Sequence, residues 1–205
     1  NRYPDPLQLK VKEKLAHQEN LNINQIFLGN GSDECIDVLI RAFCEPKDDK
    51  IIVCPPVFSM YEHSAHSQNV EVVEVLLKEE TFQLDVSVML SLSKQVKIIF
   101  ICSPNNPTGN LMHEKDIENI LTNFDGLVLI DEAYQDFSAN ESWTNRLSEF
   151  KNLVVIKTFS KAFGMADTRL GMLYANEEII HYLNTIKLPY NISEYTQELA
   201  LRALN

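Results

Sequence analysis

Seven short runs rich in β-branched and other apolar residues recur along this chain of 205 residues. Most of them are continuous rather than alternating, a pattern typical of strands whose two faces are both covered. The runs are Ile26–Gly29, Lys50–Cys54, Val70–Leu76, Lys97–Cys102, Leu127–Asp131, Leu153–Thr158 and Leu170–Ala175. They predict a sheet buried between layers of helix.

Helical spacing fills several of the gaps between these runs. Apolar residues fall at i, i+3, i+4 and i+7 in three segments, which gives each segment one apolar face. The three sets are Ile36, Leu39, Ile40 and Phe43; Ile117, Ile120, Leu121 and Phe124; and Ile179, Tyr182, Leu183 and Ile186. Strands that alternate with such helices predict an α/β fold of three layers, αβα, around a mostly parallel seven-stranded sheet.

The composition fits one globular domain with a substantial core, because 45% of the residues are hydrophobic. No apolar stretch approaches the roughly 20 residues that a membrane span needs, and the start of the chain has no signal-peptide pattern. The cysteines show no CxxC spacing, and three of the four lie in apolar surroundings, so we expect buried free thiols. They are Cys35, Cys44, Cys54 and Cys102. Free thiols favour a reducing, cytoplasmic location.

The net charge of −11 disfavours nucleic-acid binding, which normally needs a basic face. The same charge opposes an anionic ligand, so any phosphate site must be built locally from backbone N–H groups and a few cations. A basic group does stand out in residues 151–169, formed by Lys151, Lys157, Lys161 and Arg169. Its alternative interpretation is scattered surface charge.

Chemically versatile side chains gather where the predicted strands end. Asp131 closes one run, and Lys161 follows the run Leu153–Thr158 by three residues. Ligands of open α/β sheets bind beyond the carboxyl ends of the strands. A carboxylate there can pair with a protonated pyridine nitrogen, and a neutral lysine amine can attack a carbonyl. The pair predicts a site for pyridoxal 5′-phosphate (PLP), although Asp131 alone would also suit a helix N-cap.

Three further residues suit the ring of such a cofactor. Tyr134 lies three residues after Asp131, and Asn106 lies in the turn Ser103–Gly109; both side chains could donate to the ring oxygen. The Asn-Pro bond of that turn is a candidate cis peptide. Phe58 follows another strand end and could stack on the ring, with core packing as the rival interpretation.

Phosphate-binding groups come from two segments. Gly29–Glu34 leads from a strand into a helix whose N-terminus, at Ser32, Asp33 and Glu34, offers free N–H groups and a positive dipole end. Thr158 and Ser160 add hydroxyls, and Arg169 adds a bidentate cation. The glycines do not match a dinucleotide fingerprint.

A histidine pair, His63 and His66, has metal-like HxxH spacing but no third ligand nearby. We interpret it as part of a helix surface rather than a metal site.

In combination, these segments resemble the fold-type-I PLP-dependent aminotransferases, and most closely the histidinol-phosphate aminotransferase group. They occur in the family's order over nearly the whole chain. They are Asn1-Arg2-Tyr3-Pro4, Gly31-Ser32-Asp33-Glu34, Arg41-Ala42-Phe43, Cys54-Pro55-Pro56, Cys102–Gly109, Asp131–Tyr134 and Thr158–Phe163. The set is highly specific for fold and cofactor and less specific for substrate.

The resemblance implies a role for each marked residue. Lys161 would be the PLP lysine, Asp131 the partner of the pyridine nitrogen, Tyr134 and Asn106 the contacts of the ring oxygen, and Phe58 the stacking ring. The phosphate would be bound by the backbone of Ser32, Asp33 and Glu34 and by Thr158, Ser160 and Arg169. Tyr3 would reach the phosphate of a neighbouring subunit's cofactor, so the resemblance also implies a homodimer.

The resemblance further implies an amino-group exchange between histidinol phosphate and 2-oxoglutarate, giving imidazole acetol phosphate and glutamate in histidine biosynthesis. Residues 1–205 would form the PLP-binding large domain, with an N-terminal arm and a C-terminal small domain missing. Substrate-binding arginines belong to that small domain in the family. We therefore expect this stretch alone to bind the cofactor weakly and to have little or no activity.

One segment departs from the family pattern. Ala166-Asp167-Thr168-Arg169 stands where the family has Ala-Gly-Leu-Arg, which replaces a flexible glycine and adds a negative charge near the expected phosphate site. A catalytically degenerate paralogue is therefore one alternative. Others are a sister PLP enzyme, such as an aromatic aminotransferase or a threonine-phosphate decarboxylase, and a non-catalytic PLP-sensing module.

Overall fold

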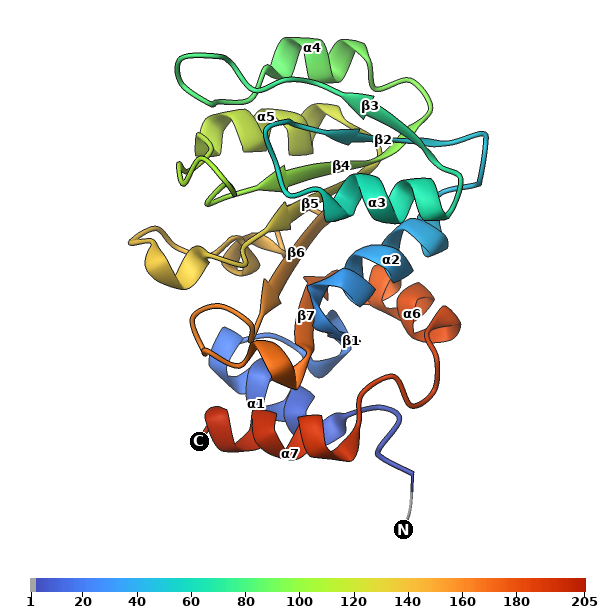
Figure 1. Cartoon of the computed structure of the whole chain (residues 1–205), viewed down its shortest axis with the longest axis vertical. Coiled ribbons are helices and arrows are strands. Elements are labelled where there is room, and N and C mark those ends of the chain that lie inside the picture. Colours follow the sequence, from blue (N-terminus) through green and yellow to red (C-terminus); the bar gives the residue numbers. More distant parts are fainter. Residues whose placement is uncertain (1–2) are drawn as a thin grey trace.

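The structure, a computed structural model, describes residues 3–205, so Asn1 and Arg2 of the first signature segment lie outside the described part. Within that part, seven strands form one sheet in the order β1-β7-β6-β5-β4-β2-β3 (Figure 1). Their bounds are β1 Ile26–Asn30, β2 Lys50–Val53, β3 Glu71–Glu74, β4 Val96–Cys102, β5 Leu127–Asp131, β6 Leu153–Thr158 and β7 Leu170–Ala175. Each strand coincides with one of the seven predicted runs to within two residues at either end.

Strand direction confirms the mostly parallel sheet. β3, β2, β4, β5 and β6 are parallel neighbours, whereas β7 lies antiparallel between β6 and β1. The connection from β6 to β7 is short, which suits antiparallel neighbours because a parallel crossover needs a dozen or more residues. As a result the end of β6, the start of β7 and the ends of β1, β4 and β5 meet at one edge of the sheet.

Helices cover both faces of the sheet and complete the three predicted layers. Apolar residues of α2, α3 and α6 pack against one face, and those of α1, α4, α5 and α7 pack against the other (Figure 1). The helices are α1 Leu9–Glu19, α2 Gly31–Phe43, α3 Met60–Ser67, α4 Val86–Ser91, α5 Glu114–Asn123, α6 Glu177–Ile186 and α7 Glu194–Ala203. None of the helices in residues 3–205 has the length and apolar character of a bilayer span.

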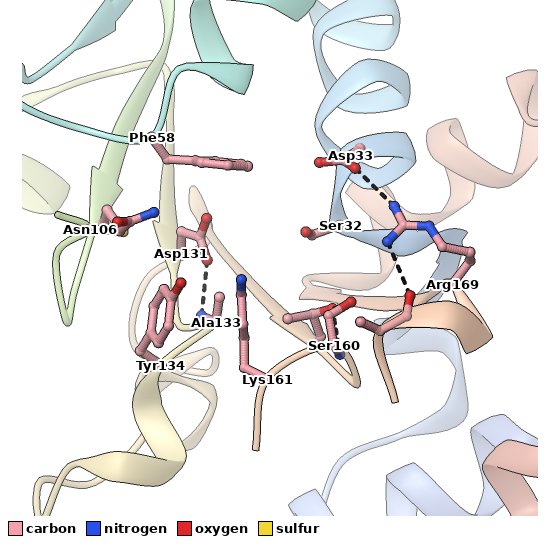
Figure 2. A pocket seen from close by; sticks show the side chains of 13 residues that line it. Ser32, Asp33, Phe58, Asn106, Asp131, Ala133, Tyr134, Ser160, Lys161 and Arg169 are labelled. Atoms are coloured by element: carbon pink, nitrogen blue, oxygen red, sulfur yellow. Dashed lines mark hydrogen bonds and ion pairs between the residues drawn. The ribbon is translucent and has the colours of Figure 1, made fainter. Parts of the chain in front are cut away.

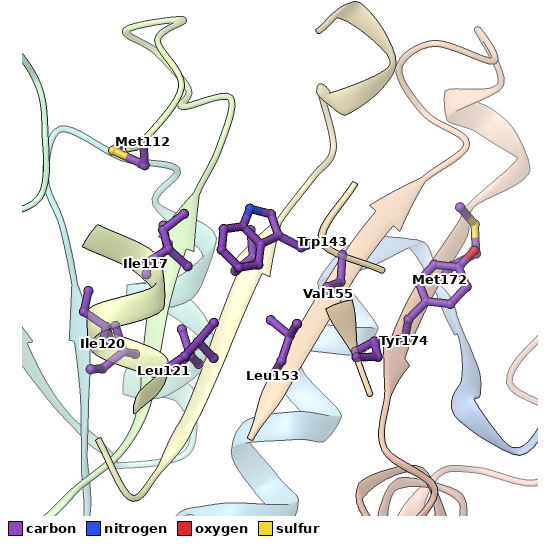
Figure 3. Close-up of a cluster of buried hydrophobic side chains, with 14 of the residues drawn as sticks. Met112, Ile117, Ile120, Leu121, Trp143, Leu153, Val155, Met172 and Tyr174 are labelled. Atoms are coloured by element: carbon purple, nitrogen blue, oxygen red, sulfur yellow. The ribbon is translucent and has the colours of Figure 1, made fainter. Parts of the chain in front are cut away.

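The continuous apolar strands are explained by burial on both sides. In β4, Ile98 and Phe100 join one core cluster, while Ile99 and Ile101 join the cluster on the opposite face. The second cluster extends to α5 and to Trp143, as Figure 3 shows. Each such side chain contributes about 1.5–3 kcal/mol when it is fully buried, so both sheet faces fix the strands that carry the site.

Two minor predictions are also confirmed. All four cysteines are free and buried. His63 and His66 are exposed on α3, as expected of a helix surface.

Candidate active site

A pocket opens at the sheet edge where the ends of β1, β4, β5 and β6 meet the start of β7. Ten of the twelve residues predicted for the site line it (Figure 2). They are Ser32, Asp33, Phe58, Asn106, Asp131, Tyr134, Thr158, Ser160, Lys161 and Arg169. Three further lining residues, Cys102, Ala133 and Ala166, were not predicted. Chain topology therefore brings six separate segments to one place.

Asp131 lies at the bottom of the pocket and is buried. Its Oδ1 accepts a hydrogen bond from the backbone N–H of Ala133 at 2.9 Å, and its Oδ2 accepts one from the Tyr61 hydroxyl at 2.5 Å. Burial raises the pKa of Asp131, whereas the two hydrogen bonds and the nearby charge of Lys161 oppose that rise. The net pKa is above the ordinary value, so this carboxylate gains from any cation placed beside it.

Lys161 projects from the loop that follows β6 toward the space between Phe58, Asp131 and Tyr134 (Figure 2). Its Nζ lies 5.2 Å from the centre of the Tyr134 ring, within cation–π distance. The loop is anchored beside the lysine, because Phe159 is fully buried and its ring stacks on Phe163 at 4.2 Å. The amine is thus exposed to the pocket on a loop that is fixed by packing.

Phe58 and Asn106 line the pocket from the β2 and β4 ends of the sheet. The Phe58 ring meets Tyr61 edge-on at 5.6 Å and also packs against the core cluster, so core packing is confirmed in part, and stacking on a cofactor ring stays a prediction. The turn around Asn106 is fixed by Asn105, whose Nδ2 donates to the backbone oxygen of Pro56 at 3.0 Å. The Asn106-Pro107 bond is cis, as predicted.

The opposite wall is built for an anion. Ser32 and Asp33 stand in the first turn of α2, and the hydroxyls of Thr158 and Ser160 hydrogen-bond each other at 3.1 Å. The Arg169 guanidinium lies across this wall, 2.9 Å from the Asp33 carboxylate (Figure 2). Free N–H groups of a helix N-terminus, hydroxyls and a guanidinium together suit a phosphate.

Gly31 makes this arrangement possible. Its φ of +77° is in the left-handed region, and a Cβ at this position would lie 2.5 Å from Nη2 of Arg169. Its backbone N–H donates to the carbonyl of Arg169 at 2.9 Å. A side chain here would therefore displace the arginine as well as strain the turn.

Two of the twelve predicted site residues, Glu34 and Tyr3, do not line the pocket. The Glu34 side chain accepts hydrogen bonds from the backbone N–H of Asn30 and from Asn191 Nδ2 instead of lining the pocket. Its expected phosphate contact concerned the backbone and stays a prediction. Tyr3 is 79% exposed and stacks on Tyr190 at 4.5 Å.

Asp167, the residue that departs from the family pattern, is exposed in the short 3₁₀ turn Ala166–Thr168. Positive φ occurs at Arg169 rather than at Asp167. The loss of the family's glycine therefore forces no left-handed strain on residue 167.

The residues present fit PLP. One wall carries a buried carboxylate beside an aromatic ring and two polar groups, the other carries an anion cradle, and an amine lies between them. This donor set matches a cationic ring nitrogen, an aromatic ring, an aldehyde and a phosphate, which are the groups that PLP presents.

Tyr61 is the residue that sequence reasoning missed. It is fully buried on α3 and reaches Asp131 across 70 positions of sequence. Its position three residues after Phe58 gave no signal, because an apolar aromatic residue on a helix is ordinarily core packing.

Comparisons with known proteins agree with this geometry. The family model described as "Aminotransferase class I and II" matches residues 1–205. A protein named histidinol-phosphate aminotransferase from Christiangramia forsetii is 52% identical over the whole chain, which covers 58% of that protein. The chain thus spans less than two thirds of the relative's length.

Two solved structures share the fold over the whole or nearly the whole chain. The histidinol-phosphate aminotransferase of Clostridium acetobutylicum superposes with a TM-score of 0.89 at 26% identity, and 61% of it is covered. L-threonine-O-3-phosphate decarboxylase from Porphyromonas gingivalis superposes over 99% of this chain and 63% of its own, with a TM-score of 0.85 at 25% identity.

Proposed function

The chain belongs to the aminotransferase class I and II family, and from that premise we propose that it is the PLP-binding part of a histidinol-phosphate aminotransferase. The observation that carries the proposal is the pocket itself, where Lys161, Asp131 and Arg169 converge from three loops. The overall reaction would transfer the amino group of histidinol phosphate to 2-oxoglutarate. Identity of 52% to a protein of that name supports histidinol phosphate as the amino donor.

When bound, PLP supplies an aldehyde that takes up amino groups and a ring that accepts electrons from the substrate carbon. The protein must therefore keep the ring electron-poor. Asp131 would do so by pairing with the protonated ring nitrogen, and its burial strengthens that pairing because few water molecules compete for the carboxylate.

Three residues would orient the ring. Tyr134 and Asn106, which line the same wall of the pocket as Asp131, would donate hydrogen bonds to the ring oxygen, and Phe58 would stack on the ring (Figure 2). The hydrogen bond from Asn105 Nδ2 to the backbone oxygen of Pro56 fixes the turn that presents the Asn106 amide. Orientation of this kind removes entropy costs before the reaction begins.

The phosphate would lie against the opposite wall. Ser32 and the backbone of Asp33 and Glu34 at the start of α2, with Thr158, Ser160 and Arg169, would bind it. The net charge of −11 repels an anionic ligand. These groups overcome that repulsion locally, because their attraction for an anion comes from local dipoles and one guanidinium.

Lys161 would have two tasks. Its Nζ would hold the cofactor through its aldehyde carbon, and the same amine would move the proton on the substrate carbon that carries the amino group. Its side chain projects between the ring wall and the phosphate wall (Figure 2).

The second candidate is a sister PLP enzyme that decarboxylates threonine phosphate. The similarity to the decarboxylase of P. gingivalis favours it, since 99% of this chain superposes on 63% of that protein at 25% identity. Identity twice as high to a histidinol-phosphate aminotransferase places it second.

The partner proposed for this chain is a second copy of itself. Tyr3 is largely exposed and stacked on Tyr190, away from the pocket of its own subunit, which leaves it available to a neighbouring site. A cytoplasmic location is part of the same proposal, because the four buried cysteines are free thiols.

The test uses the full-length protein with PLP. We expect glutamate to form when histidinol phosphate and 2-oxoglutarate are both present, and none when either is left out. Release of CO₂ from threonine phosphate, without glutamate formation, would favour the decarboxylase. If neither glutamate nor CO₂ forms, both candidates are contradicted.

A further inference from the structure

Tyr61 contacts the two groups that would bracket the cofactor ring. Its hydroxyl donates to Asp131 Oδ2 at 2.5 Å, and its ring meets Phe58 edge-on at 5.6 Å. On its other side the ring stacks on Phe100 of β4 at 4.9 Å. The side chain is fully buried, so it lines no part of the pocket and acts through its neighbours.

The hydroxyl can only be a donor to this carboxylate. Burial and the adjacent Asp131 charge raise the pKa of Tyr61 well above its usual value, so the phenol keeps its proton. A charge-assisted O–H···O⁻ bond at 2.5 Å is at the strong end of such contacts. It fixes one carboxylate oxygen while the Ala133 N–H fixes the other at 2.9 Å.

Both hydrogen bonds lower the pKa of Asp131 and so oppose the effect of its burial. Burial raises the pKa of Asp131, and the bonds from Tyr61 and Ala133 are the protein's main means of lowering it. The Ala133 donor belongs to the backbone and survives any side-chain substitution. Tyr61 is therefore the side chain that ties the charge state and orientation of Asp131 to the packing of α3 on the sheet.

We propose that Tyr61 is a positioning residue for the ring-binding wall: its hydroxyl holds the Asp131 carboxylate ready for a cationic ring nitrogen, and its ring sets the plane of Phe58. The inference rests on the proposed function, because the ring nitrogen is that of PLP. The inference assigns a role at the site to Tyr61, a residue that would touch neither cofactor nor substrate.

Other groups also face Asp131 and enter any pH dependence. Lys161 from the β6 loop favours its ionised form, and Asp33 from α2 opposes it. Cys102 of β4 stays a thiol, because burial raises its pKa to about 12. These groups are common to the wild type and to a Tyr61 variant, so a difference between the two proteins isolates the hydroxyl.

The first experiment compares Tyr61→Phe with the wild type in the full-length protein. Phenylalanine retains the stacking on Phe100 and the contact with Phe58 but removes the donor. We expect PLP to bind about tenfold more weakly near neutral pH, because the carboxylate loses one charge-assisted hydrogen bond that orients it. The loss of affinity on acidification should begin at a higher pH than in the wild type.

Tyr174→Phe is the matched control. Tyr174 is equally buried, and its hydroxyl has no hydrogen-bond partner among the described residues. This substitution should leave both the affinity for PLP and its pH profile unchanged. If Tyr61→Phe binds PLP as tightly as the wild type with the same pH profile, the inference is overturned while the proposed function stands.

A second readout needs no cofactor. The raised pKa of Asp131 means that its contribution to folding is fully present at low pH and is lost as pH rises through the native value. Removing the Tyr61 bond raises that pKa further, so the destabilisation of Tyr61→Phe should grow between pH 4 and pH 8. Denaturant unfolding at the two pH values measures it, with Tyr174→Phe again as control.

The two readouts separate two kinds of failure. If the wild type binds no PLP, the proposed function fails, and the unfolding data alone judge the claim about Asp131. A destabilisation that grows with pH then retains the tie between Tyr61 and Asp131, whereas equal destabilisation at both pH values overturns it.

Discussion

Nη2 of Arg169 lies 2.9 Å from Oδ2 of Asp33, although both residues line the wall proposed to bind phosphate. The pair is partly exposed at the edge of the pocket, with 44% and 40% of the two side chains accessible. A phosphate and the Asp33 carboxylate therefore compete for the same guanidinium. The carboxylate holds the arginine in place over Gly31, at the cost of part of its positive charge.

Asp33→Asn tests this competition. Exposed ion pairs contribute about 0.2–1 kcal/mol, so freeing the guanidinium should tighten PLP binding by about 1.4- to fivefold. The affinity for pyridoxal, which has no phosphate, should stay the same. Equilibrium titration of both ligands against the full-length protein measures the difference.

The matched control for that variant is Asp37→Asn. Asp37 pairs with Arg41 on the same helix with similar exposure, but it lies outside the pocket. A gain in affinity for PLP in the control as well, or weaker binding in Asp33→Asn, would show that the carboxylate does not compete with the phosphate.

Gly31→Ala should weaken binding of the phosphate through a clash. The new Cβ would lie 2.5 Å from Nη2 of Arg169, so the guanidinium must move. We expect PLP affinity to fall at least tenfold, with little change for pyridoxal, and stability to fall by about 1–2 kcal/mol from the left-handed backbone. Ligand titration and denaturant unfolding report the two effects separately.

Gly109→Ala separates strain from the clash. Its φ of +76° matches that of Gly31, yet nothing lies within 4 Å of its Cβ position. It should lose similar stability while keeping the preference for PLP over pyridoxal. If Gly31→Ala and Gly109→Ala lost the preference for PLP over pyridoxal equally, the result would contradict phosphate binding by Arg169.

Glu132, the neighbour of Asp131 in sequence, faces away from the pocket into a buried polar cluster. Its carboxylate accepts hydrogen bonds from Ser142 Oγ at 2.5 Å and from the Trp143 N–H at 2.7 Å, and it lies 3.9 Å from Lys157. Burial raises its pKa to about 7 despite these partners. A raised native pKa stabilises the fold at low pH, and this stabilisation disappears as pH rises through about 7.

Glu132→Gln should therefore gain stability relative to the wild type as the pH rises from 5 to 8, by up to about 3 kcal/mol. Glutamine can still accept from the Trp143 N–H and can donate to Ser142, so little is lost at low pH. Denaturant unfolding at both pH values measures the change. Glu149→Gln is the control: hydrogen bonds from Arg146 lower the pKa of exposed Glu149, so its contribution is lost only at acidic pH and this variant's difference from the wild type should stay constant between pH 5 and pH 8. A Glu132→Gln difference that does not depend on pH would contradict the account.

The strands were predictable because burial on both faces leaves a direct mark in the sequence. The runs Leu127–Asp131, Leu153–Thr158 and Leu170–Ala175 match β5, β6 and β7 to the residue. The antiparallel direction of β7 was not predictable, since an apolar run carries no sign of its direction. Helices α1 and α4 were not predicted, and α3 was expected only as a helix surface at His63 and His66, without bounds; α3 and α4 are short, with 8 and 6 residues.

The site was predictable to the extent that strand ends mark it. Asp131 and Lys161 follow strand runs, so topology alone brings them together. Tyr61 could not be found, because its contact with Asp131 depends on how α3 packs against the sheet. The pairing of Asp33 with Arg169 was hidden for the same reason, as 136 positions of sequence separate the two residues.

The central claim is that Lys161 carries PLP, and an absorbance spectrum of the full-length protein with added PLP tests it most directly. Once unbound PLP is removed, the account predicts a band at longer wavelength than that of free PLP for the wild type and for Lys151→Ala, a substitution of another lysine in the same basic group, and no such band for Lys161→Ala. Borohydride reduction should then leave the cofactor's mass on the peptide that contains Lys161. A band that persists in Lys161→Ala, or a wild-type protein that forms none, would contradict the account.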